Sequence, residues 1–115
     1  MPRVKRAVIR RKRINKLFKA SKGFFGGRKN LIRTAVNAVQ KARLYQYRDR
    51  RNRKRDFRRL WIARINAASR THGLSYSRFM GGLKKQGVDV NRKMLAQIAI
   101  DDPQAFSDLV SMSRS

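Results

Sequence analysis

The 115-residue chain carries 31 Lys and Arg residues against 6 Asp and Glu, a formal net charge of +25. This length fits one small domain rather than several. There is no Cys and only one His, which excludes disulfides and thiolate chemistry and leaves too few ligands for a zinc site. No apolar run approaches membrane-spanning length and the N-terminal segment lacks a signal-peptide core, so we expect a soluble, unsecreted protein.

The positive charge is concentrated in the first half of the chain. Residues 1–60 hold 23 basic and 2 acidic side chains, a net of +21, whereas residues 61–115 hold 8 and 4, a net of +4. Self-repulsion of this size opposes compaction unless a polyanion supplies counter-charge. We therefore predict two parts. Residues 1–59 form a basic extension with the first part of a long helix, largely unstructured without a partner, and residues 60–115 form a small globular helical domain that folds alone.

The first predicted helix covers residues 10–20. Ile14, Leu17 and Phe18 recur there at the i, i+3, i+4 spacing of one helix face. Isolated helices of this length are marginal in water, so this helix is expected to form on binding. The glycines at 23, 26 and 27 then predict a break in the chain.

A single long helix is predicted from about residue 30 to 72. No Gly or Pro interrupts this stretch, and Asn30 is a suitable N-cap. The apolar residues that share one arc of this helix are Ile32, Ala35, Val36 and Val39, followed by Phe57, Trp61, Ile65 and Ala68. At 1.5 Å per residue the helix would be about 60 Å long. A break near Asn52 is the main alternative.

Three short helices are predicted after Gly73, which is expected to end the long helix. Their predicted starts are Ser75 or Ser77, Asn91, and Asp102-Pro103, all residue types that cap or begin helices. The side chains predicted to face inward are Tyr76, Phe79, Met80 and Leu83; Met94, Leu95, Ile98 and Ala99; and Phe106, Leu109 and Val110. No segment alternates as a strand would. The predicted fold class is therefore all-α, with a basic N-terminal extension, one long helix and a small C-terminal helical domain.

The strongest functional signal is a basic run in which eight of the twelve residues from Arg48 to Arg59 are Arg or Lys. These side chains occupy nearly every direction around a helix, and Asp49 can pair only locally, for instance with Arg53. A helix that is polar all round does not pack on its own protein. Solvated helices mix both signs of charge, and Arg suits bidentate phosphate contacts. The run therefore favours binding to a nucleic-acid backbone.

Aromatic residues are interleaved with this charge, at Phe18, Phe24, Phe25, Tyr45 and Tyr47. Such rings can stack on unpaired bases or pack against the protein itself, and both interpretations stay open. Tyr45 and Tyr47 border the basic run on different faces, so at least one is expected to meet RNA. Trp61 shares a face with Phe57 and Ile65 and is predicted to be a core residue.

Other candidate sites are weak. The segment Gly26-Gly27-Arg28-Lys29 could hold a phosphate, but it lacks the full phosphate-binding loop pattern. His72 is explained by its place at a predicted helix end, and Asp102 by capping. There is no nucleophile–base pair and no metal cluster in the sequence pattern. We therefore predict no catalytic residues, no metal and no cofactor, and no enzyme activity.

Several long motifs resemble a known family. They are residues 47–51, residues 54–68, residues 73–79, residues 91–96, the opening Met1–Lys5 and the segment Lys22–Gly26. These are similar to the L20 family of bacterial large-subunit ribosomal proteins over nearly the whole chain. Ser111–Ser115 departs from the Ala/Lys-rich tail of that family.

The resemblance implies that the basic extension threads ribosomal RNA. It implies direct binding to large-subunit (23S-type) rRNA, support of early subunit assembly, and neighbouring large-subunit proteins as partners, with no membrane and no small-molecule substrate. It places the protein in ribosomes of the bacterial type, in the cytoplasm, with an organellar origin left open. The main alternative is a DNA-binding architectural protein, and a second one is an RNA-modifying enzyme.

The residues predicted to contact RNA are basic side chains of the first half of the chain and one tyrosine. They are Arg3, Lys5, Arg6, Arg10, Arg11, Lys12, Arg13, Lys16, Lys19, Lys22, Arg28, Lys29, Arg33, Arg43, Tyr47, Arg48, Arg50, Arg51, Arg53, Lys54, Arg55, Arg58 and Arg59.

Overall fold

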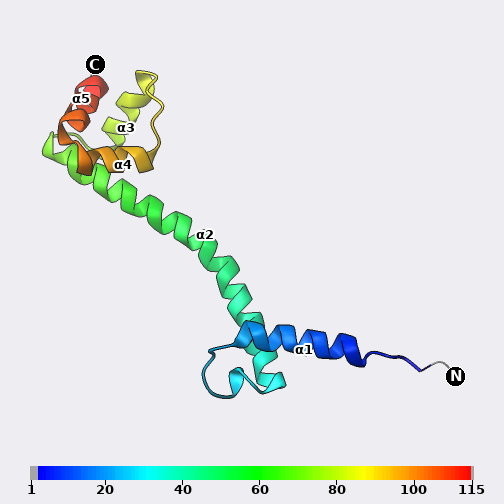
Figure 1. Ribbon diagram of the computed structural model, residues 1–115. Helices are drawn as coiled ribbons and strands as arrows, with labels where there is room; N and C mark the ends of the chain where they lie inside the picture. The colour runs from blue at the N-terminus through cyan, green and yellow to red at the C-terminus, as the bar shows by residue number, and fades with distance from the viewer. Residues whose placement is uncertain (1–2, 115) are drawn as a thin grey trace. The chain divides into compact units, whose positions relative to one another are not determined.

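The computed structural model describes residues 3–114, and it is helical with no strand in that range. Met1 and Pro2 of the opening motif and Ser115 of the tail lie outside the described residues. The helices are α1 (Ala7–Ser21), α2 (Ile32–Thr71), α3 (Tyr76–Lys85), α4 (Arg92–Asp101) and α5 (Pro103–Arg114), with a 3-10 turn at Gly26–Arg28 (Figure 1). The predicted all-α class is confirmed.

The chain divides into two compact units, which we call unit 1 (Met1–Arg51) and unit 2 (Asn52–Ser115). Unit 1 holds α1 and the first half of α2, and unit 2 holds the second half of α2 with the three short helices. The predicted division after residue 59 concerns folding in the absence of RNA, and it stays a prediction.

In unit 1 the loop between α1 and α2 is fixed at both ends. The chain turns at Gly23 and Gly26, whose φ angles are +86° and +59°, a conformation that Gly adopts without steric cost. Ser21 is fully buried, and its hydroxyl donates to the carbonyls of Phe18 and Lys29, each at 3.3 Å. This side chain therefore joins the end of α1 to the residues that lead into α2, at the break predicted from the glycines.

The long helix α2 is continuous, with no break at Asn52. Its predicted N-cap was wrong by one residue, because Leu31, and not Asn30, directly precedes the helix. The carbonyl of Leu31 accepts the first helical hydrogen bond, from the N–H of Ala35 at 2.8 Å. An N-cap side chain is useful but not required, since the other free N–H groups of a first turn can bind water.

The core of unit 2 forms where α2 meets the three short helices. Its buried residues are Ile65, Phe79, Leu83, Leu95, Ala96, Phe106 and Val110. The rings of Phe79 and Phe106 have centroids 5.1 Å apart, within the favourable range for an aromatic pair. Trp61 is partly buried against this core, so it faces the core as predicted but lies at its edge.

The predicted capping residues begin the three short helices. The side-chain oxygens of Ser75, Asn91 and Asp102 accept from the N–H groups of Arg78, Met94 and Ala105, at 3.5, 2.9 and 3.0 Å. Gly73 follows the end of α2 with a φ of +76°, as predicted. The sequence predicted these helix ends correctly because capping depends on a few neighbouring residues rather than on the whole fold.

Three residues that helical spacing places on an apolar face are exposed. Ile32, Phe57 and Met94 keep 43%, 49% and 52% of their surface accessible. A helical wheel gives the direction of a side chain but not how far the neighbouring element extends. The ring of Phe57 lies beside that of Trp61, with centroids 6.2 Å apart, and is still half exposed. In α4 the buried positions are Leu95 and Ala96, and Ala96 was not predicted.

Candidate nucleic-acid interface

Every side chain predicted to contact RNA is exposed in the structure, from Arg3 in the N-terminal segment to Arg59 on α2. The earlier members lie on or near α1, Arg28 and Lys29 lie in the loop, and the remainder lie on α2. Their cationic groups are thus available to a partner. Which of them bind RNA stays a prediction.

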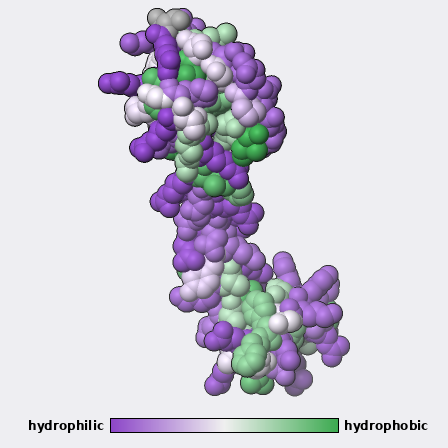
Figure 2. Space-filling model, turned by 90° about the vertical axis from the view of Figure 1, so that its left-hand side faces the viewer, coloured by the Kyte–Doolittle hydropathy of each residue, from purple (hydrophilic) through white to green (hydrophobic). Residues whose placement is uncertain are grey.

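The basic run lies on the middle of α2, and hydrophilic side chains cover the face of this stretch seen in Figure 2. Two ion pairs involve it among residues 3–114. Arg48 Nε lies 2.8 Å from Asp49 Oδ1, and Arg59 Nη1 lies 3.5 Å from Asp56 Oδ1. All four side chains are largely accessible to solvent, where such pairs contribute little stability. The remaining six basic residues of the run have no carboxylate partner in the described chain, so most of the charge is uncompensated.

The predicted pairing of Asp49 with Arg53 was wrong, because Asp49 accepts instead from Arg48, its neighbour in sequence. The Arg48 guanidinium lies over the ring of Tyr45, 4.7 Å from its centroid, and this position brings Nε beside the carboxylate. The hydrogen bond and the negative charge of Asp49 raise the pKa of Arg48 above its ordinary value. Arg48 therefore keeps its charge at any physiological pH.

Both tyrosines that border the run are covered by a guanidinium on one face. The Arg51 guanidinium lies 3.7 Å from the centroid of the Tyr47 ring, and the Arg48 guanidinium lies 4.7 Å from the centroid of the Tyr45 ring. The i, i+3 and i, i+4 spacings on a helix bring these pairs together, and the cation is attracted by the ring face. About half of each tyrosine is still accessible. The rings are thus held in place without being buried.

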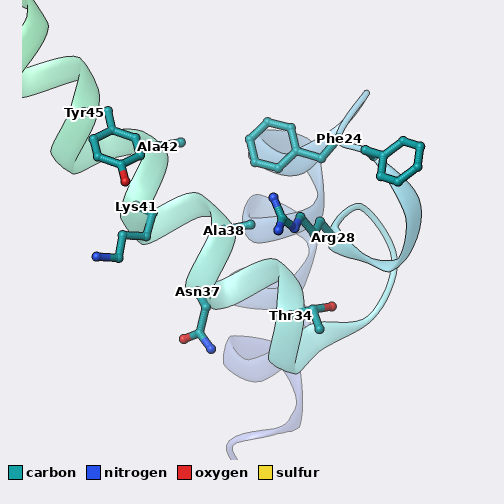
Figure 3. Close-up of a pocket in the computed structure, with 9 residues that line it drawn as sticks. Phe24, Arg28, Thr34, Asn37, Ala38, Lys41, Ala42 and Tyr45 are labelled. Carbon is teal, nitrogen blue, oxygen red and sulfur yellow. The ribbon is translucent and has the colours of Figure 1, made fainter.

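Unit 1 also contains a groove that brings the loop and α2 together (Figure 3). We call it the loop–helix groove. Its volume is about 650 Å³, and it is lined by Phe24, Phe25, Arg28, Thr34, Asn37, Ala38, Lys41, Ala42 and Tyr45. Ala38 and Ala42 point from α2 toward the loop, whereas Asn37 and Lys41 extend from the other side of the helix. The groove therefore has a small-residue floor on α2 and the Arg28 side chain on its loop side.

The loop side of this groove is held by Thr34. Its hydroxyl donates to the carbonyl of Gly27 at 2.8 Å and to that of Leu31 at 3.0 Å. The Gly26–Arg28 segment, predicted as a weak phosphate loop, forms a 3-10 turn here and places Arg28 at the groove. The glycine-rich loop and the aromatic residues Phe24, Phe25 and Tyr45 therefore lie at one groove, whereas the sequence analysis considered them as separate candidate sites.

The sequence-based set of contacts omitted Lys41, which lines the groove. Its spacing could have indicated this position, since Lys41 lies four residues before Tyr45 and is therefore on the same side of α2. The groove itself had no local signal, because it depends on where the loop after α1 folds back on the helix.

The remaining candidates have structural roles. The carbonyl of His72 accepts from the Arg114 guanidinium, and its ring lies 6.3 Å from that of Phe106. No group of three or more possible metal ligands occurs among residues 3–114. In the same range no helix combines the length and the apolar character needed to cross a bilayer.

These features define a class of strongly basic, all-helical proteins in which a long helix presents charge that its own chain does not neutralise. Within that class the match is specific. The family model for ribosomal protein L20 covers residues 3–109, and the chain belongs to this family. The resemblance drawn from the sequence motifs is thereby confirmed. The family is structural and non-enzymatic, as predicted.

Relatives match over essentially their whole length. A large ribosomal subunit protein bL20 from Methylibium petroleiphilum is 62% identical over 110 residues, which are 96% of this chain and 93% of the relative. The protein of that name from Prochlorococcus marinus is 59% identical over all of both chains. The one from Carboxydothermus hydrogenoformans is 56% identical over 114 residues, 99% of this chain and 97% of the relative.

Proposed function

We propose that this chain is a structural component of the large ribosomal subunit, that it binds large-subunit rRNA directly, and that it supports early subunit assembly. The supporting observation is the basic run on α2, in which six of eight cations have no carboxylate partner within the described chain. A continuous helix of this kind needs a polyanion around it. The names of the relatives point to the ribosome as the source of that polyanion.

The chemistry of binding follows from the charges. Arg and Lys side chains neutralise phosphates where RNA helices converge, and the released counterions favour association. A-form RNA hides its base edges in a deep, narrow major groove, so contacts from the run fall on phosphates and 2′-hydroxyl groups. Recognition then depends on the shape of the RNA, read by many contacts at fixed spacing along the rigid helix.

The rest of the proposal concerns the partners and the order of events. Residues 1–59 become ordered on the rRNA, while residues 60–115 fold first and act as an anchor. Neighbouring large-subunit proteins are the expected protein partners, in bacterial-type ribosomes of the cytoplasm. The low net charge of residues 61–115, +4 against +21 for residues 1–60, supports this division of roles.

Direct binding measurements test the proposal. The full chain is titrated with fragments of large-subunit rRNA and with duplex DNA of the same number of phosphates, at several salt concentrations. We expect tighter binding to an rRNA fragment at every salt concentration, since phosphate charge is matched and only the shape and the 2′-hydroxyl groups of the RNA differ. Equal affinity for all the RNA and DNA ligands, or a preference for DNA, would favour a DNA-binding architectural protein.

A further inference from the structure

We propose that the loop–helix groove of unit 1 takes up one unpaired base of an RNA, with its backbone phosphates at the cationic edge. This inference rests on the proposed function, RNA binding, and adds a specific subsite to it. The basic run on α2 binds without regard to sequence. The groove instead offers a place for the flat face of a base.

Aromatic surface is exposed at the groove. Phe25 is 94% accessible and Tyr45 is 48% accessible, and both line the groove. Exposed apolar surface rimmed by polar residues marks interaction sites. All four bases can stack on an aromatic ring, so such stacking does not depend on the RNA sequence. A volume of about 650 Å³ lies within the range of sites that hold small organic molecules, about 300–1,000 Å³. The groove is therefore large enough for one nucleotide.

In the folded helix the Tyr45 ring is held by its neighbours. Asp49 accepts a hydrogen bond from Arg48 at 2.8 Å, and the Arg48 guanidinium lies over the Tyr45 ring. These contacts fix the position of the ring at the groove once α2 is ordered. A ring covered on one face by a cation still presents its remaining surface to the groove that it lines.

The groove edge carries positive charge and no negative charge. Arg28 supplies a cation on the loop side of the groove, and no carboxylate lines it. Ala38 and Ala42 leave the floor open. A cation beside aromatic rings suits a phosphate-linked aromatic ligand. An apolar peptide would gain nothing from this cation.

The test compares two probes on the same protein. One probe is a short oligoadenylate, and the other is an abasic oligoribonucleotide with the same number of phosphates. We expect the full chain to bind the oligoadenylate about tenfold more tightly, the value of roughly one stacked base. The affinity ratio isolates the base, because phosphate contacts and any ordering of unit 1 are common to both probes.

Three variants and one control locate the effect. Phe25→Ala and Tyr45→Leu remove stacking surface, and Ala42→Leu fills the floor without removing an aromatic ring. Each should bring the ratio close to one. Phe57→Leu is the matched control, since Phe57 is also an aromatic residue of α2 that is half-exposed but does not line the groove. It should keep most of the wild-type ratio, and circular dichroism of the complexes checks that helix content is unchanged.

The outcomes separate this inference from the proposed function. Equal affinity of the wild-type chain for both probes, with steep salt dependence retained, would overturn the base site and leave RNA binding intact. An unchanged ratio in Tyr45→Leu, or an equal loss in Phe57→Leu, would also overturn it and assign the aromatic rim to another partner. Failure of the wild-type chain to bind either probe or rRNA would instead contradict the proposed function.

Discussion

At the scale of single residues, two adjacent glycines of α3 meet very different surroundings. A Cβ added at Gly82 would collide with the backbone carbonyl of Ser113 on α5, whereas one added at Gly81 would have no atom within 4 Å. Both residues lie inside α3, where Gly is a poor helix former. The close approach of α5 therefore explains why position 82 holds Gly, whereas no contact explains Gly at position 81.

This pair gives a stability prediction. Gly82→Ala should lower the free energy of unfolding by about 1–3 kcal/mol, because the backbones of α3 and α5 must separate. Gly81→Ala should raise it by up to about 1 kcal/mol through helix propensity alone. Urea denaturation followed by the fluorescence of Trp61 measures both. Equal effects of the two substitutions would show that α5 does not pack on α3 in this way.

A second residue-scale prediction compares two phenylalanines that both lie on an apolar helix face in the sequence pattern. Phe106 is 1% accessible and Phe57 is 49% accessible. Phe106→Ala should cost about 3–5 kcal/mol, the range for a buried aromatic ring, while Phe57→Ala should cost well under half of that. The same urea titration reports both values. A cost at Phe57 as large as that at Phe106 would mean that Phe57 is covered in solution.

At the scale of elements, the sequence predicted each helix because the signals are local. The absence of Gly and Pro over α2, and the capping residues Ser75, Asn91 and Asp102, act within a few positions of the chain. The errors arose where a second element decides the outcome. Met94 is about half exposed although it follows the helical pattern, and Asn30 lies one residue too early because the loop sets where α2 begins.

The candidate site shows the same limit. The basic run could be predicted to be an exposed surface, because no packing could bury charge on every side of a helix. The loop–helix groove could not be predicted, although its aromatic residues were identified as candidates for base stacking. Phe25 and Tyr45 are twenty positions apart, and only the turn at Gly23 and Gly26 brings their segments to one groove.

An element-scale prediction concerns the charge of the run. Replacing Arg53, Lys54 and Arg55 together by Ala should make the slope of log affinity against log salt shallower by about two to three units. It should leave the preferred RNA and the thermal stability of unit 2 unchanged, since all three side chains are exposed. Titration of rRNA fragments across salt gives the slope.

The matched control exchanges the same residues without changing their charge, as Arg53→Lys, Lys54→Arg and Arg55→Lys. Its slope should equal that of the wild-type chain, because the number of phosphates neutralised is the same. If the alanine variant kept the wild-type slope, these three side chains would not be in contact with phosphates.

At the scale of the whole molecule, the charge partition predicts unequal order in the free chain. Residues 1–45 should exchange their amide hydrogens rapidly at low salt, while the helices of unit 2 are protected. Addition of large-subunit rRNA should slow exchange in the N-terminal region, because the RNA supplies the counter-charge that allows compaction. Hydrogen exchange read by mass spectrometry or NMR measures this. Protected amides throughout residues 1–45 of the free chain would contradict it.

We propose that this chain holds rRNA mainly through the phosphates of the RNA. The most direct test of this proposal is the affinity of the full chain for a large-subunit rRNA fragment, measured across a range of salt concentrations. If about ten phosphates are engaged, a plot of log affinity against log salt should have a slope of roughly −7 to −9. A slope near zero, with affinity retained at high salt, would contradict the account, because binding would then rest on contacts other than those of the exposed cations.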